Sequence, residues 1–184
     1  LAPTTMQGSN IVAQEFDILI LGGGSAGYSA AIRARQLGFT VGLIEKEKVG
    51  GTCLHTGCIP TKAYLHAAEL AEEAREASKV GVNAVLQSIE MGKVRDYKDN
   101  IVSGKFKGLA GLLNMKGVEV IPGEGKLTAQ DTITVGGVEY KGKNIILASG
   151  SVSKTFGLPI EGRVLTSTEA LEMDYLPKSA IVLG

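Results

Sequence analysis

A run of glycines between two short apolar segments does most to limit how this 184-residue chain can fold. Residues 16–21 are almost continuously apolar, which is typical of a parallel strand buried on both faces. The six residues that follow, 22–27, read GGGSAG. An Ala- and Arg-rich helix is predicted next, over 28–37 and capped by Gly38, and then a second strand over 40–44. This order predicts a βαβ unit in an α/β fold.

The spacing of these glycines indicates a binding function for the βαβ unit. Gly22 permits a tight turn, Gly24 lets backbone approach a pyrophosphate, and Gly27 allows the helix to pack closely. The helix N-terminus would then face the phosphates. Glu45 follows the second strand, about 20 residues further on, where a carboxylate can accept hydrogen bonds from a ribose. Glycines alone also serve simple packing, but together with Glu45 they predict a dinucleotide site.

Both cysteines of the chain lie in the segment 50–62, GGTCLHTGCIPTK. Five positions on an ideal helix span about 7.5 Å of rise, whereas a disulfide needs Cα atoms within about 4.4–6.8 Å of each other. A bridge between Cys53 and Cys58 therefore requires a distorted backbone, which Gly57 and Pro60 favour. A helix that starts near Cys58 would stabilise a thiolate there. The segment predicts redox chemistry.

Other interpretations of these residues stay open. The cysteines can form a structural disulfide, although residues 1–15 lack a secretory signal and a reducing compartment is expected. Cys53, His55, Cys58 and His66 are four potential metal ligands, but their spacing is unlike that of common zinc sites. His55 is predicted to lie in a loop and His66 on an ordinary helix face. For Lys62 the alternative is a solvated surface position.

Composition excludes some classes of partner. The chain carries 19 basic and 19 acidic side chains and no Lys/Arg block, which argues against nucleic acid or an anionic membrane as the main ligand. The longest apolar run, around 18–21, is far too short to span a bilayer. With 44% hydrophobic residues, the chain is predicted to be a soluble globular domain or slightly more.

The remaining pattern predicts two helices and a β-rich region. Helices are expected over 63–78 and from 93 or 97 to 115. Turn signals then separate four short segments of a small antiparallel meander. A buried strand over 144–148 leads to the turn Ser149-Gly150-Ser151, and residues 181–184 resemble the start of another strand. The four meander segments are 118–121, 125–128, 132–135 and 138–140.

Taken together, these motifs resemble the FAD domain of the pyridine nucleotide-disulfide oxidoreductases, and among them the dihydrolipoamide dehydrogenases. The resemblance covers residues 16–184 and rests on the glycines of 22–27, on Glu45, and on the segment 50–62 with its Pro60-Thr61-Lys62 ending. Two departures stand out. His55 occupies a position where the family usually has Asn, and Ser149 one where it often has Thr.

The resemblance implies a role for each matching residue. Cys58 would be the thiol beside the flavin ring and Cys53 the exchange thiol attacked by substrate. Lys62 would lie near the ring, where a cation stabilises negative charge that develops on reduction. The residues expected to bind FAD are Gly22, Gly24, Ser25, Ala26, Gly27, Glu45, Lys46, Gly51, Thr52, Lys62, Gly125, Ser149, Gly150 and Ser151.

The resemblance also implies a reaction and a domain plan. Dihydrolipoamide, free or on the lipoyl domain of a 2-oxoacid dehydrogenase complex, would pass electrons through Cys53, Cys58 and FAD to NAD in a homodimeric parent, in a bacterial cytoplasm or a mitochondrial matrix. Residues 1–15 would be a flexible leader, 16–150 an FAD domain without the family's late Gly-Asp segment, and 151–184 a connection into an NAD domain. We expect such a fragment to be inactive alone. The alternatives are a stand-alone flavin or redox-switch module, or a glutathione or mercuric reductase type.

Overall fold

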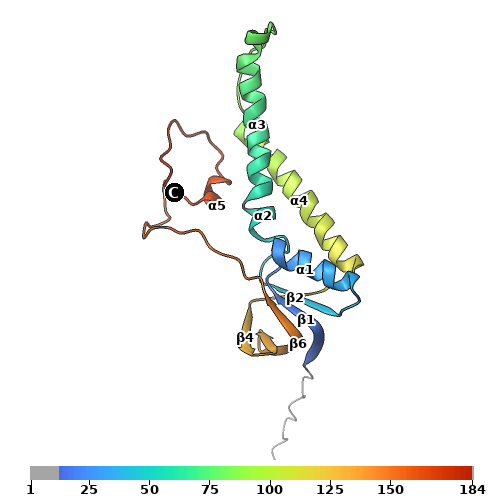
Figure 1. The fold of residues 1–184 in the computed structure, drawn as a ribbon. Helices are drawn as coiled ribbons and strands as arrows, with labels where there is room; N and C mark the ends of the chain where they lie inside the picture. Colours follow the sequence, from blue (N-terminus) through green and yellow to red (C-terminus); the bar gives the residue numbers. More distant parts are fainter. Residues whose placement is uncertain (1–12, 184) are drawn as a thin grey trace, which may run out of the picture. The chain divides into compact units, whose positions relative to one another are not determined.

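The computed structural model describes residues 13–183, which form one six-stranded sheet and several helices (Figure 1). The chain divides into two compact units. The first contains the segments up to Lys48 and from Leu113 to Ser149, and the second contains Val49–Leu112 and the segment from Gly150 onward. Most of the predicted leader lies outside the described residues. Its last two residues already belong to the first strand, which begins at Gln14.

The sheet of the first unit is parallel on one side and antiparallel on the other, in the order β3-β2-β1-β6-β5-β4. Strands β3, β2, β1 and β6 run parallel to their neighbours, whereas β6, β5 and β4 are joined as antiparallel pairs. The α/β prediction is therefore confirmed. The strands are β1 (Gln14–Leu21), β2 (Val41–Glu45), β3 (Glu119–Pro122), β4 (Gly125–Ala129), β5 (Thr132–Val135) and β6 (Val138–Leu147).

Two features of the β-rich region differ from the prediction. The segment expected as the first meander strand is β3, which instead pairs in parallel with β2, Ile121 opposite Ile44. The segments 138–140 and 144–148 were predicted as separate strands, but β6 runs through both. Gly142 makes this continuity possible, because a Cβ there would lie 2.6 Å from the Leu19 Cβ. Residues 138–141 pair with β5 and residues 140–147 pair with β1, so the whole of β6 has a partner.

Helix α1 (Ser25–Gln36) follows the glycine run and packs small residues, Ala31 and Ala34, into the core. It starts three residues earlier than predicted, with Gly24 as its N-cap. Gly38, at a φ of +88°, takes the left-handed conformation expected of a C-terminal cap. Central strand residues such as Leu19 and Leu43 are fully buried. Each such side chain contributes about 1.5–3 kcal/mol of hydrophobic stabilisation.

The second unit is mainly helical (Figure 1), and side-chain contacts join its two long helices. His66 of α3 and Tyr97 of α4 have ring centroids 6.3 Å apart. The two long helices were predicted, although each begins a few residues earlier than expected. The helices are α2 (Gly51–His55), α3 (Cys58–Glu76), the 3-10 helix η1 (Ala77–Val80), α4 (Met91–Met115), which runs on into the first unit, and α5 (Ser167–Ala170).

The C-terminal segment differs from its prediction at two places. Helix α5 was not predicted, although Thr166 and Glu169 form a capping box at its start. The strand predicted at 181–184 does not form over its described residues, 181–183. A strand requires a hydrogen-bonded neighbour, and within residues 13–183 no strand pairs with this segment.

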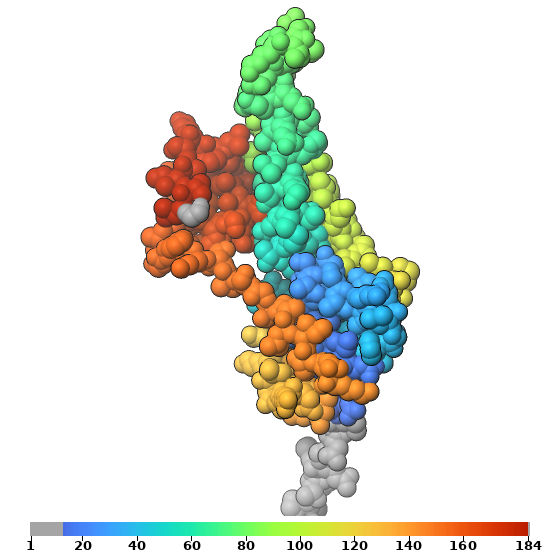
Figure 2. Space-filling model, viewed as in Figure 1, coloured from blue at the N-terminus to red at the C-terminus, as the bar shows by residue number. Residues whose placement is uncertain are grey.

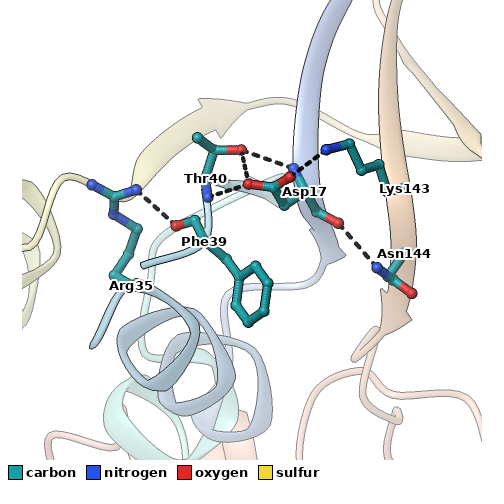
Figure 3. A network of polar contacts seen from close by, with 6 residues as sticks. All are labelled: Asp17, Arg35, Phe39, Thr40, Lys143 and Asn144. Carbon is teal, nitrogen blue, oxygen red and sulfur yellow. Dashed lines mark hydrogen bonds and ion pairs between the residues drawn. The ribbon is translucent and has the colours of Figure 1, made fainter. Parts of the chain in front are cut away.

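A polar network ties together β1, the start of β2 and β6 in the first unit (Figure 3). The Asp17 carboxylate accepts hydrogen bonds from the Thr40 backbone N–H and hydroxyl and from the Lys143 ammonium, each 2.8 Å long. The hydrogen bond from Lys143, followed by those from Thr40, holds the pKa of Asp17 well below its ordinary value. Nearby, Arg35 donates to the Phe39 carbonyl at 2.7 Å.

Replacing Asp17 by Asn should lower the urea midpoint of unfolding at pH 7, because the ion pair with Lys143 is lost. The native pKa of Asp17 is depressed, so its contribution is complete above the unfolded-state value of about 3.9 and is lost as the pH falls toward the native value. The midpoints of the parent chain and Asp17→Asn should therefore begin to converge below about pH 4 and meet only as the pH approaches the native pKa of Asp17. A difference as large at pH 3 as at pH 7 would contradict this.

Candidate functional site

The glycine run of the first unit is packed so closely that side chains are excluded at two positions. Gly22 has a φ of +107°, and a Cβ there would lie 2.2 Å from the Ala148 carbonyl oxygen. A Cβ on Gly27 would lie 1.8 Å from the Gly22 carbonyl oxygen. Both atoms are backbone and cannot swing away. The tight turn predicted at Gly22 and the close helix packing predicted at Gly27 are confirmed.

The start of α1 offers backbone N–H groups to an anion. The first N–H groups of a helix have no intrahelical acceptor. At α1 the N-cap is Gly24, and in the described part of the chain no side chain caps it. The first turn holds no acidic residue, and both Ser25 and Ala26 are exposed. This arrangement suits a phosphate or pyrophosphate.

Glu45 lies beside the glycine run and is oriented by two backbone donors. The Gly23 N–H donates to Oε2 at 2.7 Å, and the Glu47 N–H donates to Oε1 at 2.8 Å. Each carboxylate oxygen keeps a further lone pair that can accept a hydroxyl hydrogen. Gly23 was not among the predicted site residues, although it stands in the middle of the run. A side chain there would press against Glu45, 3.0 Å from Oε2.

The other predicted cofactor residues fall on both units. Ser149 follows β6, whose end is held beside the glycine run by a 2.8 Å hydrogen bond from the Ala148 N–H to the Leu21 carbonyl. Gly150 and Ser151 are exposed residues of the second unit. A Cβ on Gly125 would meet Leu21 Cδ1 at 2.7 Å, so a side chain there would displace residues of the core. The remaining predicted binding residues are Lys46, exposed after β2, and Gly51 and Thr52, which open α2.

The two cysteines of the second unit lie on either side of a break between helices. Cys53 belongs to α2, and Cys58 is the first residue of α3. At the break, a Cβ on Gly57 would lie 2.9 Å from the Thr52 carbonyl oxygen. The predicted distortion and the predicted helix start at Cys58 are confirmed. Both residues are free thiols, Cys58 exposed and Cys53 partly buried.

Contact between the two thiols makes them chemically unequal. A side-chain hydrogen bond with Cys58, and then burial, raises the pKa of Cys53. The positive charge of Lys62 opposes this shift, which places the exposed Lys62 within electrostatic reach of the Cys53 sulfur. Cys53 is therefore held as a thiol. A dithiol can close into a disulfide only when its two cysteines lie close together.

The prediction that His55 lies in a loop is wrong, because it is the last residue of α2. Its Nε2 lies 3.0 Å from the Val49 carbonyl oxygen, and its ring meets Phe106 of α4 edge-on at 5.5 Å between centroids. The other histidine, His66 of α3, packs against Tyr97 of α4. Over residues 13–183, no three His, Cys, Asp or Glu side chains gather as metal ligands.

Comparison with known proteins gives these motifs a family. The model of the pyridine nucleotide-disulphide oxidoreductases matches residues 16–184. The chain belongs to this family. A dihydrolipoyl dehydrogenase from Bacillus subtilis is 42% identical over 94% of this chain and 40% of its own length. A mitochondrial dihydrolipoyl dehydrogenase from Dictyostelium discoideum is 41% identical over 93% of this chain and 37% of its own length.

A solved member of the oxidoreductase family supports the fold. The HOCl-induced flavoprotein disulfide reductase RclA from Escherichia coli matches with a TM-score of 0.70 and 26% identity, over 88% of this chain and 35% of that chain. The chain thus spans between 36% and 54% of the length of the curated relatives named among its matches. Family membership implies FAD binding and disulfide oxidoreductase chemistry. Across residues 13–183, no helix is long and apolar enough to cross a membrane.

Proposed function

We propose that this chain is the FAD-binding and dithiol part of a dihydrolipoyl dehydrogenase that oxidises dihydrolipoamide and reduces NAD. The observation that carries the proposal is the pair Cys53 and Cys58, which flank the break between α2 and α3 closely enough for Cys58 to raise the pKa of Cys53. The 42% identity to the Bacillus subtilis dihydrolipoyl dehydrogenase supports this substrate over other disulfides.

Disulfide exchange would proceed at Cys53. With Cys53 and Cys58 joined, a dihydrolipoyl thiolate attacks the Cys53 sulfur, the protein disulfide breaks, and Cys58 leaves as a thiolate. The second dihydrolipoyl sulfur then attacks the mixed disulfide, which releases cyclic lipoamide and Cys53. The electron pair lost by the substrate now resides on the protein dithiol. The raised pKa of Cys53 favours the protonated form of that sulfur.

The residues present fit an FAD molecule. The exposed N–H groups at the start of α1 would hold the pyrophosphate, and the oriented Glu45 carboxylate would accept the ribose hydroxyls. Gly51, Thr52 and the turn 149–151 would contact the cofactor through backbone, and Lys62 would stand near the ring. When bound, FAD accepts the electron pair from the dithiol and passes it to NAD.

The partners proposed for the whole protein follow from this chemistry. They are dihydrolipoamide or the lipoyl domain of a 2-oxoacid dehydrogenase complex, together with a second copy of the protein. We place the protein in a reducing compartment, a bacterial cytoplasm or a mitochondrial matrix. The two cysteines are free thiols, and a reducing compartment keeps thiols in that state.

A flavin spectrum tests the proposal. The chain, mixed with FAD and passed through a desalting column, should retain the flavin absorption. Anaerobic dithiothreitol should then produce a long-wavelength band, because the reduced Cys58 sulfur would lie beside the flavin ring and could donate charge to it. Cys58→Ser should lose this band, whereas Cys53→Ser should show it without any reductant. An intact band in Cys58→Ser would exclude the proposed arrangement.

A further inference from the structure

Helix α2, which carries Cys53, is too short to hold its own position. It has five residues, and isolated helices much longer than this are marginal in water. Its N-cap, Gly50, has a φ of +113°, and no side chain of the described residues caps it. Only Leu54 in α2 is buried. The location of the Cys53 sulfur therefore depends on contacts that α2 makes with its surroundings.

His55 supplies the polar contact that closes α2. The imidazole Nε2 lies 3.0 Å from the Val49 carbonyl oxygen. A carbonyl oxygen only accepts hydrogen bonds, so Nε2 carries the hydrogen and donates it. Val49 directly precedes the N-cap and is itself 6% exposed. The bond therefore joins the last residue of α2 to the buried residue just before its first turn.

The same imidazole connects α2 to a long helix. The Phe106 ring of α4 lies at a centroid distance of 5.5 Å and an angle of 62°, an edge-to-face contact. Helix α4 has 25 residues and is packed on α3, so it is a far more rigid support than α2. His55 thus holds α2 from two sides, two residues away from Cys53.

We propose that His55 is a positioning residue that keeps Cys53 in reach of Cys58 and thereby sets the redox potential of the pair. This inference rests on the proposed dithiol function. Holding α2 in place raises the effective concentration of one thiol toward the other, which favours the disulfide. Without the contacts of His55, Cys53 samples positions away from Cys58, and the equilibrium shifts toward the dithiol form.

The test is the equilibrium between dithiol and disulfide in glutathione buffers, read by acid quench, alkylation and mass spectrometry of the whole chain. The chain has only two cysteines, so the readout is unambiguous. His55→Phe keeps a ring beside Phe106 but removes the donor. The equilibrium constant for disulfide formation should fall about fivefold, the weight of one hydrogen bond, which corresponds to a potential about 20 mV less negative.

Two further variants make the result specific. His55→Gln restores an N–H donor and should return the constant to within about twofold of the parent value. His66→Phe makes the same replacement at the other histidine, which contacts Tyr97 and not α2, and should change nothing. An equal shift in His66→Phe, or no rescue by His55→Gln, would overturn the assignment.

The outcomes separate the two proposals. If the parent chain forms no Cys53–Cys58 disulfide in any buffer, the dithiol function itself fails. If the parent forms it and His55→Phe lies within twofold of the parent, only the role of His55 fails. Circular dichroism verifies that each variant is folded. Should His55→Phe not fold, Phe106→Leu takes its place, with an expected shift of about threefold in the same direction, and the absence of that shift would refute the role of His55.

Discussion

Replacing Gly27 by alanine should strongly destabilise the chain and abolish its uptake of FAD. The new Cβ would lie 1.8 Å from the Gly22 carbonyl oxygen, far inside the contact distance of two unbonded atoms. Neither atom belongs to a flexible side chain, so α1 or the glycine turn must move. Overpacking in a core usually costs about 1–3 kcal/mol. A displaced backbone should place Gly27→Ala at the upper end, about 3 kcal/mol, in urea unfolding.

The loss of FAD uptake follows from the same displacement. The turn at Gly22 and the first N–H groups of α1 form the proposed pyrophosphate site, so moving either removes the geometry that an anion requires. A matched control is Gly104→Ala in α4, where an added Cβ meets no atom within 4 Å. Alanine is favoured over glycine in a helix by about 1 kcal/mol, so this variant should be slightly stabilised and should retain FAD. If Gly27→Ala unfolds at the parent's urea midpoint, the tight packing at Gly27 is not required.

The βαβ unit was predictable because its determinants are local. A continuous apolar run, a glycine turn and a helix capped by Gly38 follow one another in the sequence, and each indicates its own conformation. The requirement for glycine at position 22 is also local in origin, since a φ of +107° disfavours other residues. The helix start was placed late only because glycines and serine have low helix propensity.

Strand partners were less accessible to sequence reasoning, because pairing joins distant segments. A short apolar strand such as β3 carries no mark that distinguishes a meander from a parallel neighbour of β2. The segments on either side of Gly142 were predicted as two separate strands, yet they form one strand, β6, where two different strands provide partners. Helix α5 was a different case. Its capping box, Thr166 with Glu169, is readable in the sequence and could have revealed it.

The candidate site likewise contains residues that local motifs predict and residues whose contacts depend on distant segments. The roles proposed for Cys53, Cys58 and Glu45 depend on spacing within short motifs, which a sequence displays. The ring contact of His55 is with Phe106, which belongs to a different helix far along the chain, so no local sequence pattern predicts this contact. The burial of Lys98 is equally non-local, since lysine is almost never buried unless paired.

Replacing Lys98 by methionine should release the segment around α5 from the helices of the second unit. The Lys98 side chain is only 2% exposed. Its ammonium donates to the Leu171 carbonyl at 3.1 Å and to the Glu172 carboxylate at 2.8 Å. The Tyr64 hydroxyl of α3 donates to the same Leu171 carbonyl at 2.8 Å. Lys98 therefore joins α4 to the residues directly after α5, which lie against α3 in Figure 2.

The charge of Lys98 persists despite its burial. Burial lowers the pKa of a lysine, but the hydrogen bonds to the Glu172 and Asp99 carboxylates outweigh it, so the pKa of Lys98 is raised. A raised native pKa gives a contribution that is complete below the unfolded-state value of about 10.4 and is lost as the pH rises through the native value. At neutral pH the full effect of Lys98→Met should be measurable.

We expect Lys98→Met to cost about 2 kcal/mol, because a charge-assisted hydrogen bond contributes about 1.5–3 kcal/mol and the two carboxylates left behind are solvated. The apolar methionine side chain supplies no donor for the Leu171 carbonyl, so the hydrogen bond from Tyr64 has to hold that carbonyl without the ammonium. A Glu-specific protease should cut after Glu169 or Glu172 at least about tenfold faster, because about 1.4 kcal/mol of easier local opening is a factor of ten.

The control is Lys105→Met, which removes an exposed lysine from the same helix and should leave both the urea midpoint and the cleavage rate close to those of the parent chain. Tyr64→Phe removes the other donor to the Leu171 carbonyl and should accelerate cleavage by a smaller factor, because a neutral hydrogen bond contributes only about 1 kcal/mol. If Lys98→Met is cleaved no faster than Lys105→Met, the segment around α5 is held by its apolar contacts, such as the buried Leu171 side chain, and not by the Lys98 ammonium.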